Sequence, residues 1–264
     1  MSGFSADWLA LREANDWRAR SPLVTEIVAK QISRDRVVRA GDLAAGAGSN
    51  MRFLARRLPQ PQEWRLLDHD AGLLERARQN ADIAIETRVV DLSHVDELRE
   101  LVSGRDLVTA SALLDLVSEE WLRAVCSMCH RQRSLVLFAL SYDGRMTCAP
   151  QDQEDELVRR LVNRHQRMDK SFGRALGPDA SARARDILEG LGYNVVRDRS
   201  DWVLDRESNE LQRQLIEGWA AAATEIAPGD TEPIAGWRVR RLEHVRAGES
   251  SVTVGHEDLG AFIA

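Results

Sequence analysis

Short apolar runs alternate with amphipathic stretches between residues 37 and 140. The first pattern is typical of buried strands, and the second, in which apolar residues recur every three or four positions, is typical of helices. Strands are expected at 37–42, 64–68, 85–90, 105–110 and 134–140, and helices between them near 50–58, 72–80, 94–102 and 118–130. Five short strands with helices between them predict a parallel sheet covered by helices on both faces. The chain is therefore expected to be an α/β protein with a doubly wound, mostly parallel sheet.

Helical periodicity also extends to both sides of this region. Before it, helices are expected from Asp7 to Arg20 and from Pro22 to about Ile32, and they would form a helical N-terminal cap. After residue 140 we expect helices at 152–167, 181–191, 207–226 and 232–246, a sixth strand at 193–197 and a seventh at 251–255. The complete prediction is a seven-stranded sheet with extra helices after strands five and six.

Composition and charge narrow the class of protein. Hydrophobic residues make up 44% of the 264 positions and charged residues 30%, which is typical of a soluble globular protein. The net charge of -6 disfavours nucleic acid as a partner. No apolar run has the length of a membrane span, and the first residues lack the basic and apolar regions of a signal peptide. We therefore expect a cytoplasmic protein with no membrane partner.

Two patterns of metal-binding residue types are present, and neither predicts a metal site. Cys126, Cys129 and His130 match the C-x-x-C-H motif of covalent haem attachment. They fall at the end of an expected helix, and haem attachment requires an exported protein, so we interpret the cysteines as buried thiols, with a redox pair as the alternative. His256 stands beside two acids, but this spacing gives no ligand geometry. No metal is predicted.

The first expected strand runs into an acid and a glycine-rich turn, Asp42 to Gly48, and a helix follows at once. A phosphate-binding P-loop needs a lysine after its second glycine, and none is present. A dinucleotide-binding turn needs a small residue where Met51 stands. The second expected strand ends in Asp68, twenty residues past Gly48, which is the spacing at which a doubly wound fold places an acid on a ribose hydroxyl. The pattern indicates a crevice for an adenosine-containing ligand without a pyrophosphate.

These landmarks resemble the class I S-adenosylmethionine-dependent methyltransferases. The segment from Asp42 through Gly46 to Gly48 is similar to their first motif, with Ala44 in place of the first glycine. The resemblance implies that Asp68 would hold both ribose hydroxyls.

The other landmarks of this resemblance follow later strands. His69 would lie against the adenine of the cofactor, and Asp91 and Leu92, after the third strand, would meet the adenine amino group. Ser111 lies in the motif that passes beside the methionine portion. The resemblance covers about residues 36 to 140 and implies S-adenosylmethionine as cofactor, with S-adenosylhomocysteine as product. The expected organisation is one methyltransferase domain over residues 1–264, with a cap at 1–33, a cofactor-binding core at 34–140, and substrate-side helices and the last strands at 141–264.

The chemistry of these residues supports a cationic ligand independently of the resemblance. Ligands of open α/β sheets bind outside the carboxyl ends of the strands, where Asp42, Asp68, Asp91 and Ser111 all fall. Carboxylates suit a ligand with a sulfonium, an ammonium and two ribose hydroxyls. The alternative for Asp42 and Asp68 is turn or helix-cap chemistry at a strand end. For Asp91 the alternative is a helix cap shared with Ser93.

Methyl transfer depends mainly on alignment, and a general base is expected where the acceptor carries a proton. Candidates for the catalytic group are Tyr142 and Asp143, after strand five, and His165, ahead of a glycine-containing loop. A turn motif is the alternative for the first two. For His165 the alternative is a solvated helix end.

Candidates for substrate binding lie at the same helix end and in the N-terminal helix. Arg167 and Lys170 have the charge to hold a carboxylate or phosphate on the acceptor. Arg12 and Asp16 form part of a polar set between two tryptophans of a helix suited to close over the site. The alternative for Arg167 and Lys170 is a solvated helix end whose cations face the helix dipole. The alternative for Arg12 and Asp16 is an ordinary packed cap.

The sequence therefore predicts an enzyme that transfers a methyl group from S-adenosylmethionine to an oxygen or nitrogen of a small molecule, as a monomer or homodimer. An RNA methyltransferase is one alternative, although the chain is acidic and lacks the Asn/Asp-Pro-Pro-aromatic motif of base-amino methyltransferases. A non-catalytic protein that kept the fold is another, because Ala44 replaces a glycine. The acceptor, its pathway and the need for a base are left open.

Overall fold

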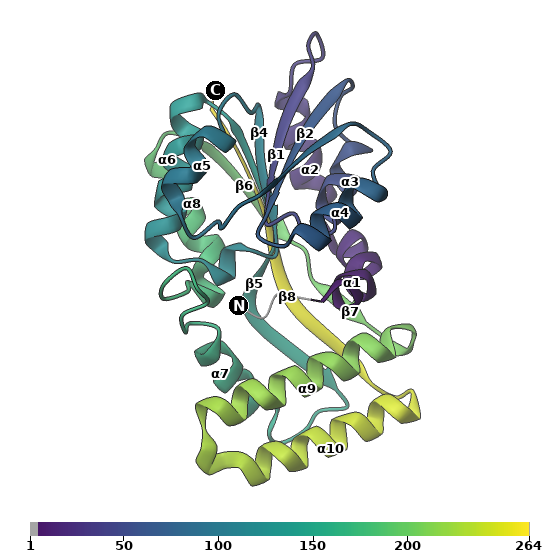
Figure 1. The fold of residues 1–264 in the computed structure, drawn as a ribbon. Coiled ribbons are helices and arrows are strands. Elements are labelled where there is room, and N and C mark those ends of the chain that lie inside the picture. The colour runs from purple at the N-terminus through teal and green to yellow at the C-terminus, as the bar shows by residue number, and fades with distance from the viewer. Residues whose placement is uncertain (1–4, 264) are drawn as a thin grey trace.

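The computed structural model describes residues 5–263, and its centre is an eight-stranded sheet (Figure 1). The strands are β1 (Val38–Leu43), β2 (Gln62–Asp68), β3 (Ile85–Val89), β4 (Leu107–Ser111), β5 (Leu135–Ala149), β6 (Asn194–Arg199), β7 (Trp202–Leu204) and β8 (Ser251–Phe262). Their order is β3-β2-β1-β4-β5-β8-β6, and β7 pairs with β8. Strands β1 to β5 are parallel, whereas β8 is antiparallel to both β5 and β6. The mostly parallel, doubly wound sheet is confirmed, with β8 inserted between β5 and β6 relative to the order 3-2-1-4-5-6 of dinucleotide-binding folds.

Helices cover both faces of the sheet, as expected. They are α1 (Ala6–Ala19), α2 (Pro22–Gln31), α3 (Ser49–Ala55), α4 (Ala71–Gln79), α5 (Val95–Leu101), α6 (Glu119–Gln132), α7 (Asp155–His165), α8 (Ala180–Gly190), α9 (Asn209–Ile226) and α10 (Thr231–Ala247). Buried side chains of α2, α3 and α4 form one core with the sheet, and those of α5, α6 and α8 form another. Because both faces are covered, β1 has one exposed residue in six.

A third core lies below the sheet, where α7, α9, α10 and β7 pack on the extended ends of β5 and β8 (Figure 1). Strand β5 was expected to end at residue 140 and instead continues to Ala149. Irregular pairing with β8 interrupts it twice, near Leu140 (φ 51°) and Gly144 (φ 87°). The expected end of the strand at residue 140 is therefore wrong, since the turn-like residues at 141–145 form bulges within one long strand. The short β7 was missed, and it raises the strand count from seven to eight.

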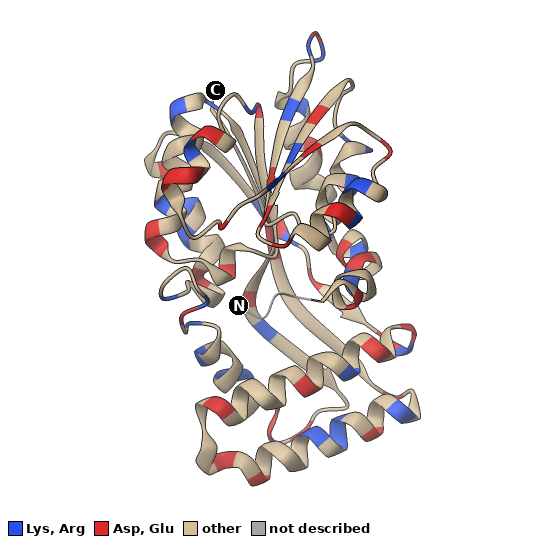
Figure 2. Ribbon diagram, viewed as in Figure 1, with Lys and Arg blue, Asp and Glu red and all other residues tan. Residues whose placement is uncertain are grey.

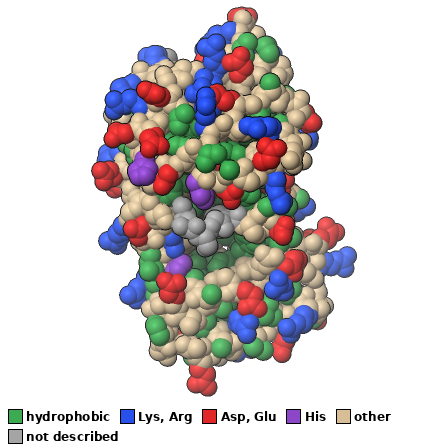
Figure 3. Space-filling model, in the orientation of Figure 1, with side chains coloured by type: hydrophobic (Ala, Val, Ile, Leu, Met, Phe, Trp, Pro, Cys, Tyr) green, Lys and Arg blue, Asp and Glu red, His purple; other side chains and the backbone are tan. Residues whose placement is uncertain are grey.

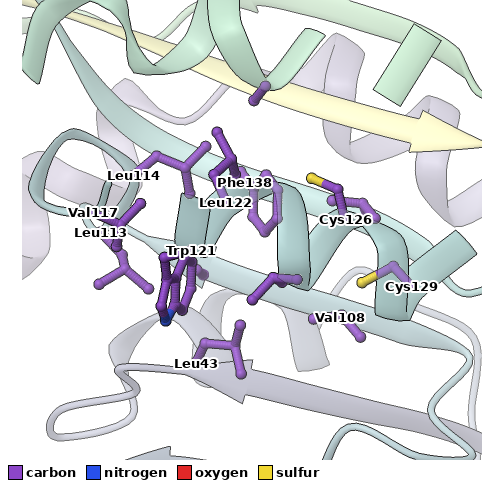
Figure 4. Close-up of a cluster of buried hydrophobic side chains, with 14 of the residues drawn as sticks. Leu43, Val108, Leu113, Leu114, Val117, Trp121, Leu122, Cys126, Cys129 and Phe138 are labelled. Atoms are coloured by element: carbon purple, nitrogen blue, oxygen red, sulfur yellow. The ribbon is translucent and has the colours of Figure 1, made fainter. Parts of the chain in front are cut away.

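The cysteines of the C-x-x-C-H motif belong to the core. Cys126 and Cys129 of α6 are buried beside Val108 and Phe138 of the sheet (Figure 4). Burial raises the pKa of Cys129 to about 12 and that of Cys126 well above its usual value. Thiols in this state are poor nucleophiles and poor metal ligands at neutral pH, so the interpretation as buried thiols is confirmed.

No helix within residues 5–263 combines the length and the hydropathy that crossing a bilayer requires. Within the same residues, no three or more His, Cys, Asp or Glu side chains gather in a way that could hold a metal ion.

Candidate functional site

The turn after β1 has the backbone of a glycine-rich loop. Ala44, Gly46 and Gly48 all adopt left-handed conformations, with φ of 52°, 52° and 81°. A Cβ on Gly48 would lie 3.0 Å from the Cβ of Ala77 in α4, and one on Gly46 would lie 3.2 Å from Leu9 of α1. The turn therefore keeps its shape although an alanine stands at its first left-handed position, where a Cβ costs about 1–2 kcal/mol.

A pair of substitutions tests this strain. Gly48→Ala is expected to lower the free energy of unfolding by about 1–3 kcal/mol, because it adds both left-handed strain and a close contact with Ala77. Ala44→Gly is the matched change in the opposite direction. It relieves strain but adds chain entropy to the unfolded state, so stability should stay within about 1 kcal/mol of the wild type. Urea unfolding checks both, and equal stabilities of the two variants would contradict the argument.

Asp68, at the end of β2, is bound directly to this turn. Its Oδ2 accepts a hydrogen bond from the Gly46 amide at 2.8 Å, and its Oδ1 accepts one from the Asp70 amide at 2.9 Å. His69 is exposed, with Nδ1 3.2 Å from Asp68 Oδ1. The cap of α4 is Asp70, whose carboxylate accepts from the next helix amides, and not Asp68. Each Asp68 oxygen keeps lone-pair capacity for a further donor.

Asp42 is completely buried at the end of β1 and has one oxygen without a partner. Its Oδ1 accepts from Asn50 Nδ2 at 2.8 Å, while Oδ2 has no hydrogen-bond partner among the described residues. Burial raises the pKa of Asp42 to about 7. Asn50 in turn accepts from Arg20 at 2.7 Å, and Arg20 Nε donates to Asp258 Oδ2 of β8 at 3.0 Å. This buried polar chain fixes Asp42 from the side opposite to the turn.

The landmarks after β3 and β4 differ in exposure. Asp91 is exposed, and its Oδ1 accepts from the Ser93 amide at 2.9 Å in the turn before α5. The N-cap of α5 is His94, so Asp91 does not cap this helix. Leu92 is buried in the core, where its carbonyl accepts from Trp121 Nε1. Ser111 is half-buried at the end of β4.

The three expected catalytic residues have protein partners and do not form one cluster. The Tyr142 hydroxyl donates to Asn163 at 2.8 Å, and burial raises the pKa of Tyr142. Asp143 accepts from Arg145 Nε at 2.8 Å, in an ion pair that Arg145 extends to a second aspartate. His165 lies 3.2 Å from Lys170 and contacts an exposed glutamate on α9. The contacts of Tyr142 and Asp143 with other side chains therefore give both residues a structural role.

Arg12 and Asp16 form a buried ion pair of α1, with 2.9 Å between Nε and Oδ2. Asp16 also accepts from Trp202 Nε1 at 3.0 Å, and the Arg12 guanidinium lies 4.9 Å from the centre of that ring. The pair therefore attaches α1 to β7. Arg167 pairs with Asp179 at 2.9 Å instead of remaining free.

Comparisons with known proteins agree with this architecture. No model of a known protein family matches the chain, and no curated protein sequence does. Among solved structures, the YcgJ protein of Bacillus subtilis is 13% identical, with 92% of this chain and 100% of that chain covered and a TM-score of 0.50. The cyclopropane synthase MmaA2 of Mycobacterium tuberculosis is 8% identical over 97% of each chain, with a TM-score of 0.47. A phosphoethanolamine N-methyltransferase of Haemonchus contortus is 12% identical over 97% of this chain and 56% of that chain, with a TM-score of 0.46. Identities this low bear on the fold alone.

The chain has the doubly wound α/β fold of the YcgJ protein. In this fold the carboxyl ends of β1, β2 and β4 lie at one edge of the sheet, and the turn residues and Asp68 meet there.

A buried acid that the sequence analysis missed lies at the same edge. Asp115 follows β4 in the short helical turn Leu114–Leu116 and is nearly inaccessible. The nearby amides of Asp115 itself and of Tyr142 favour the ionised form of its carboxylate, and so do the charges of Arg12 and Lys170. Burial nevertheless raises the pKa of Asp115 to about 6. The charges of Arg12 and Lys170, two of the expected substrate-binding residues, thus act on the carboxylate of Asp115, which follows Ser111 closely in the sequence.

His256 of β8 faces the same region from below. Its ring lies 5.0 Å from that of Trp202 and 6.2 Å from that of Tyr142, and its Nδ1 has no hydrogen-bond partner in the described part of the chain. Burial lowers the pKa of His256 to about 3, so the ring is neutral at physiological pH. The surface is hollowed where the upper α/β part meets the part formed by α7, α9 and α10 (Figure 3). Arg12 and His256 both lie against the ring of Trp202 in β7, and the charge of Arg12 also acts on Asp115.

Proposed function

We propose that this protein binds S-adenosylmethionine at the carboxyl edge of the sheet and transfers its methyl group to an oxygen or nitrogen of a small molecule. The observation that carries the proposal is the contact between the left-handed turn and Asp68. It joins a backbone that approaches a ligand closely to an acid that ends the neighbouring strand. An acid at this place suits a ligand with two adjacent hydroxyls, because each carboxylate oxygen can accept a hydrogen bond from one of them.

The residues present fit the cofactor. Asp42 supplies a buried carboxylate oxygen that lacks a partner, and negative charge there favours the ammonium and sulfonium of the methionine portion. A side chain on Gly48 would fill part of the turn. Asp68 would hold the ribose, Asp91 would lie near the adenine, and Ser111 would lie beside the methionine portion. When bound, S-adenosylmethionine supplies an electrophilic methyl group on a positively charged sulfur.

The chain itself would orient the acceptor and take its proton. Asp115 is the group best suited to act as general base, since a pKa near 6 leaves it ionised at neutral pH and still able to hold a proton. Arg12 and Lys170 approach it from α1 and from the loop after α7. Their charges suit an acceptor that carries a carboxylate or phosphate. His165, which contacts Lys170, would position that lysine rather than react.

Calorimetry on the full chain tests cofactor binding. S-adenosylmethionine and S-adenosylhomocysteine should bind and NAD should not. Asp68→Ala should weaken S-adenosylhomocysteine binding about 100-fold, because two hydrogen bonds to a charged group are worth about 3 kcal/mol together. The matched control is Asp70→Ala. This substitution removes the two hydrogen bonds by which Asp70 caps α4, next to the site, so the affinity of the variant for S-adenosylhomocysteine should change less than about threefold.

Preference for NAD, or no binding of any of the three ligands, would reject the proposal. Binding that is unaffected by Asp68→Ala would favour the non-catalytic alternative. An RNA substrate would appear as a gel shift that weakens as salt rises, since phosphate contacts release counterions.

A further inference from the structure

A second cavity lies away from the methyl-transfer site, on the face of the sheet covered by α2 and α3. It has a volume of about 780 Å³ and is bounded by the end of α1, by α2, by α3 and by the loop at 57–60. Five cations line it: Arg18, Arg20, Lys30, Arg34 and Arg57. Glu26 is the one acid among the lining residues, which all belong to the described part of the chain. We call this cavity the arginine groove.

Most of these cations are not neutralised by the protein. Within residues 5–263, Arg34 and Arg57 have no acidic partner, and Arg18 binds only the side-chain oxygen of Asn15. Lys30 and Glu26 are 3.9 Å apart and both are exposed. Arginines and acids are interspersed over the rest of the ribbon (Figure 2), where Arg213 of α9, for example, pairs with Glu210. Unpaired like charges around one cavity repel each other, so they favour an anion between them.

Arg20 gives the groove a buried donor. Its side chain is 2% exposed, and Nε and Nη1 are bound to Asp258 and Asn50, but Nη2 has no hydrogen-bond partner among the described residues. A buried guanidinium that lacks one bond normally has it supplied by water or a ligand. Arg20 is one of the residues that line the groove, so this buried, unsatisfied donor belongs to the wall of the cavity.

The groove also has an aromatic wall. The Arg57 guanidinium stacks 3.7 Å from the centre of the Phe53 ring, and Arg20 lies 4.5 Å from the same ring. Burial and the nearby Arg20 and Arg56 lower the pKa of Arg57, which is consistent with crowded positive charge. Trp17 and two prolines complete the lining. Arginine planes and aromatic faces together bind flat rings as well as phosphates.

We propose that the arginine groove binds a small organic anion that joins a phosphate to a flat, apolar ring. The volume is that of a small-molecule site. A phosphate matches guanidinium forks better than a single carboxylate does, and it carries enough charge to satisfy several cations. Arg20 connects the groove through Asn50 to Asp42 of the methyl-transfer site, but the proposed groove ligand does not depend on the proposed function.

Calorimetry with 1-naphthyl phosphate tests the proposal, with 1-naphthol and inorganic phosphate as the two halves of the probe. The complete probe should bind at least tenfold more tightly than either half. In the double variant Arg18→Gln/Arg34→Gln its affinity should fall at least tenfold, while S-adenosylhomocysteine binding stays within threefold. Both arginines have few contacts with the rest of the protein, so folding should be retained, and circular dichroism checks this. Arg213→Gln, on α9, is the matched control and should leave probe binding unchanged.

Three results would overturn the proposal. The first is no binding of 1-naphthyl phosphate at millimolar concentration, and the second is equal binding by the double variant and the wild type. The third is a single-stranded RNA that binds more tightly than the probe and is released by the same double substitution, because the groove would then be part of a nucleic-acid surface. Since S-adenosylhomocysteine binding is measured separately, failure of this proposal is distinct from failure of the proposed methyl transfer.

Discussion

Replacing Asp115 by asparagine is expected to lower kcat for methyl transfer by about 10²- to 10⁴-fold, the usual contribution of a general base. The substitution keeps the size of the side chain and its ability to accept from the two amides, but it removes the site that takes the proton. Affinity for S-adenosylhomocysteine should change less than threefold. The rate of S-adenosylhomocysteine release in the presence of a competent acceptor measures the effect.

The pH dependence separates a base from a merely structural acid. The pKa of Asp115 is raised to about 6, so its reactive, ionised form prevails above pH 6 and is lost as the pH falls through 6. The wild-type rate should therefore rise between about pH 5 and 7, and this limb should be absent in Asp115→Asn. The control is Asp143→Asn, whose carboxylate is paired with Arg145 and which should keep the limb. An unchanged acid limb in Asp115→Asn would rule out this residue as the base.

Asp155→Ala is expected to lower the free energy of unfolding by about 3–5 kcal/mol, because it leaves a buried charge unpaired. Arg241 of α10 is fully buried, and its guanidinium binds both oxygens of Asp155 and the carbonyl of Pro150. Trp237 also donates to Asp155, at 2.8 Å. Because α7 and α10 meet through this carboxylate, the lower core should weaken first. Urea unfolding followed by tryptophan fluorescence measures the change.

A double substitution shows whether the charge itself is responsible. In Asp155→Leu/Arg241→Met both members of the pair become apolar, so most of the lost stability should return. Glu210→Ala, which breaks an exposed pair with Arg213 on α9, should cost less than about 1 kcal/mol. If the double variant were as unstable as Asp155→Ala, the loss would come from packing and not from an unpaired charge.

The alternating region was predictable because both of its signals are local. An apolar run buried on both faces and a helix with one apolar side each leave a pattern within a few residues, and the observed elements follow the expected ones closely up to Leu135. The continuation of β5 to Ala149 was not predictable in this way. Asp143 and Gly144 have the composition of a turn, and the pairing of Tyr142 and Met146 on either side with β8, more than a hundred residues later, keeps them in a strand.

The residues of the candidate site likewise differ in whether the local sequence reveals them. The turn from Ala44 to Gly48 and Asp68 could be recognised because backbone geometry demands small residues at fixed spacing. The buried chain beyond Asn50 could not, since Arg20 and Asp258 are 238 positions apart in the sequence and meet only through the fold. Asp115 left a weak local signal, an acid within the apolar run after β4. An acid in such a run indicates either a ligand site or a paired core charge, and three-dimensional neighbours are needed to separate the two.

The long strands β5 and β8 limit how the protein can move. With 15 residues, β5 spans on the order of 50 Å if extended, and it belongs to the core of the α/β part and to the core below it. Two bulges interrupt the pairing, but strands that are paired on both sides of them do not bend like a linker, so the two parts should not open and close as a hinge does. Entry of reactants must then depend on smaller elements, namely α1 and the loop at 166–176. Unlike a two-domain clamp, this architecture would keep the distance from β1 to α10 constant during turnover.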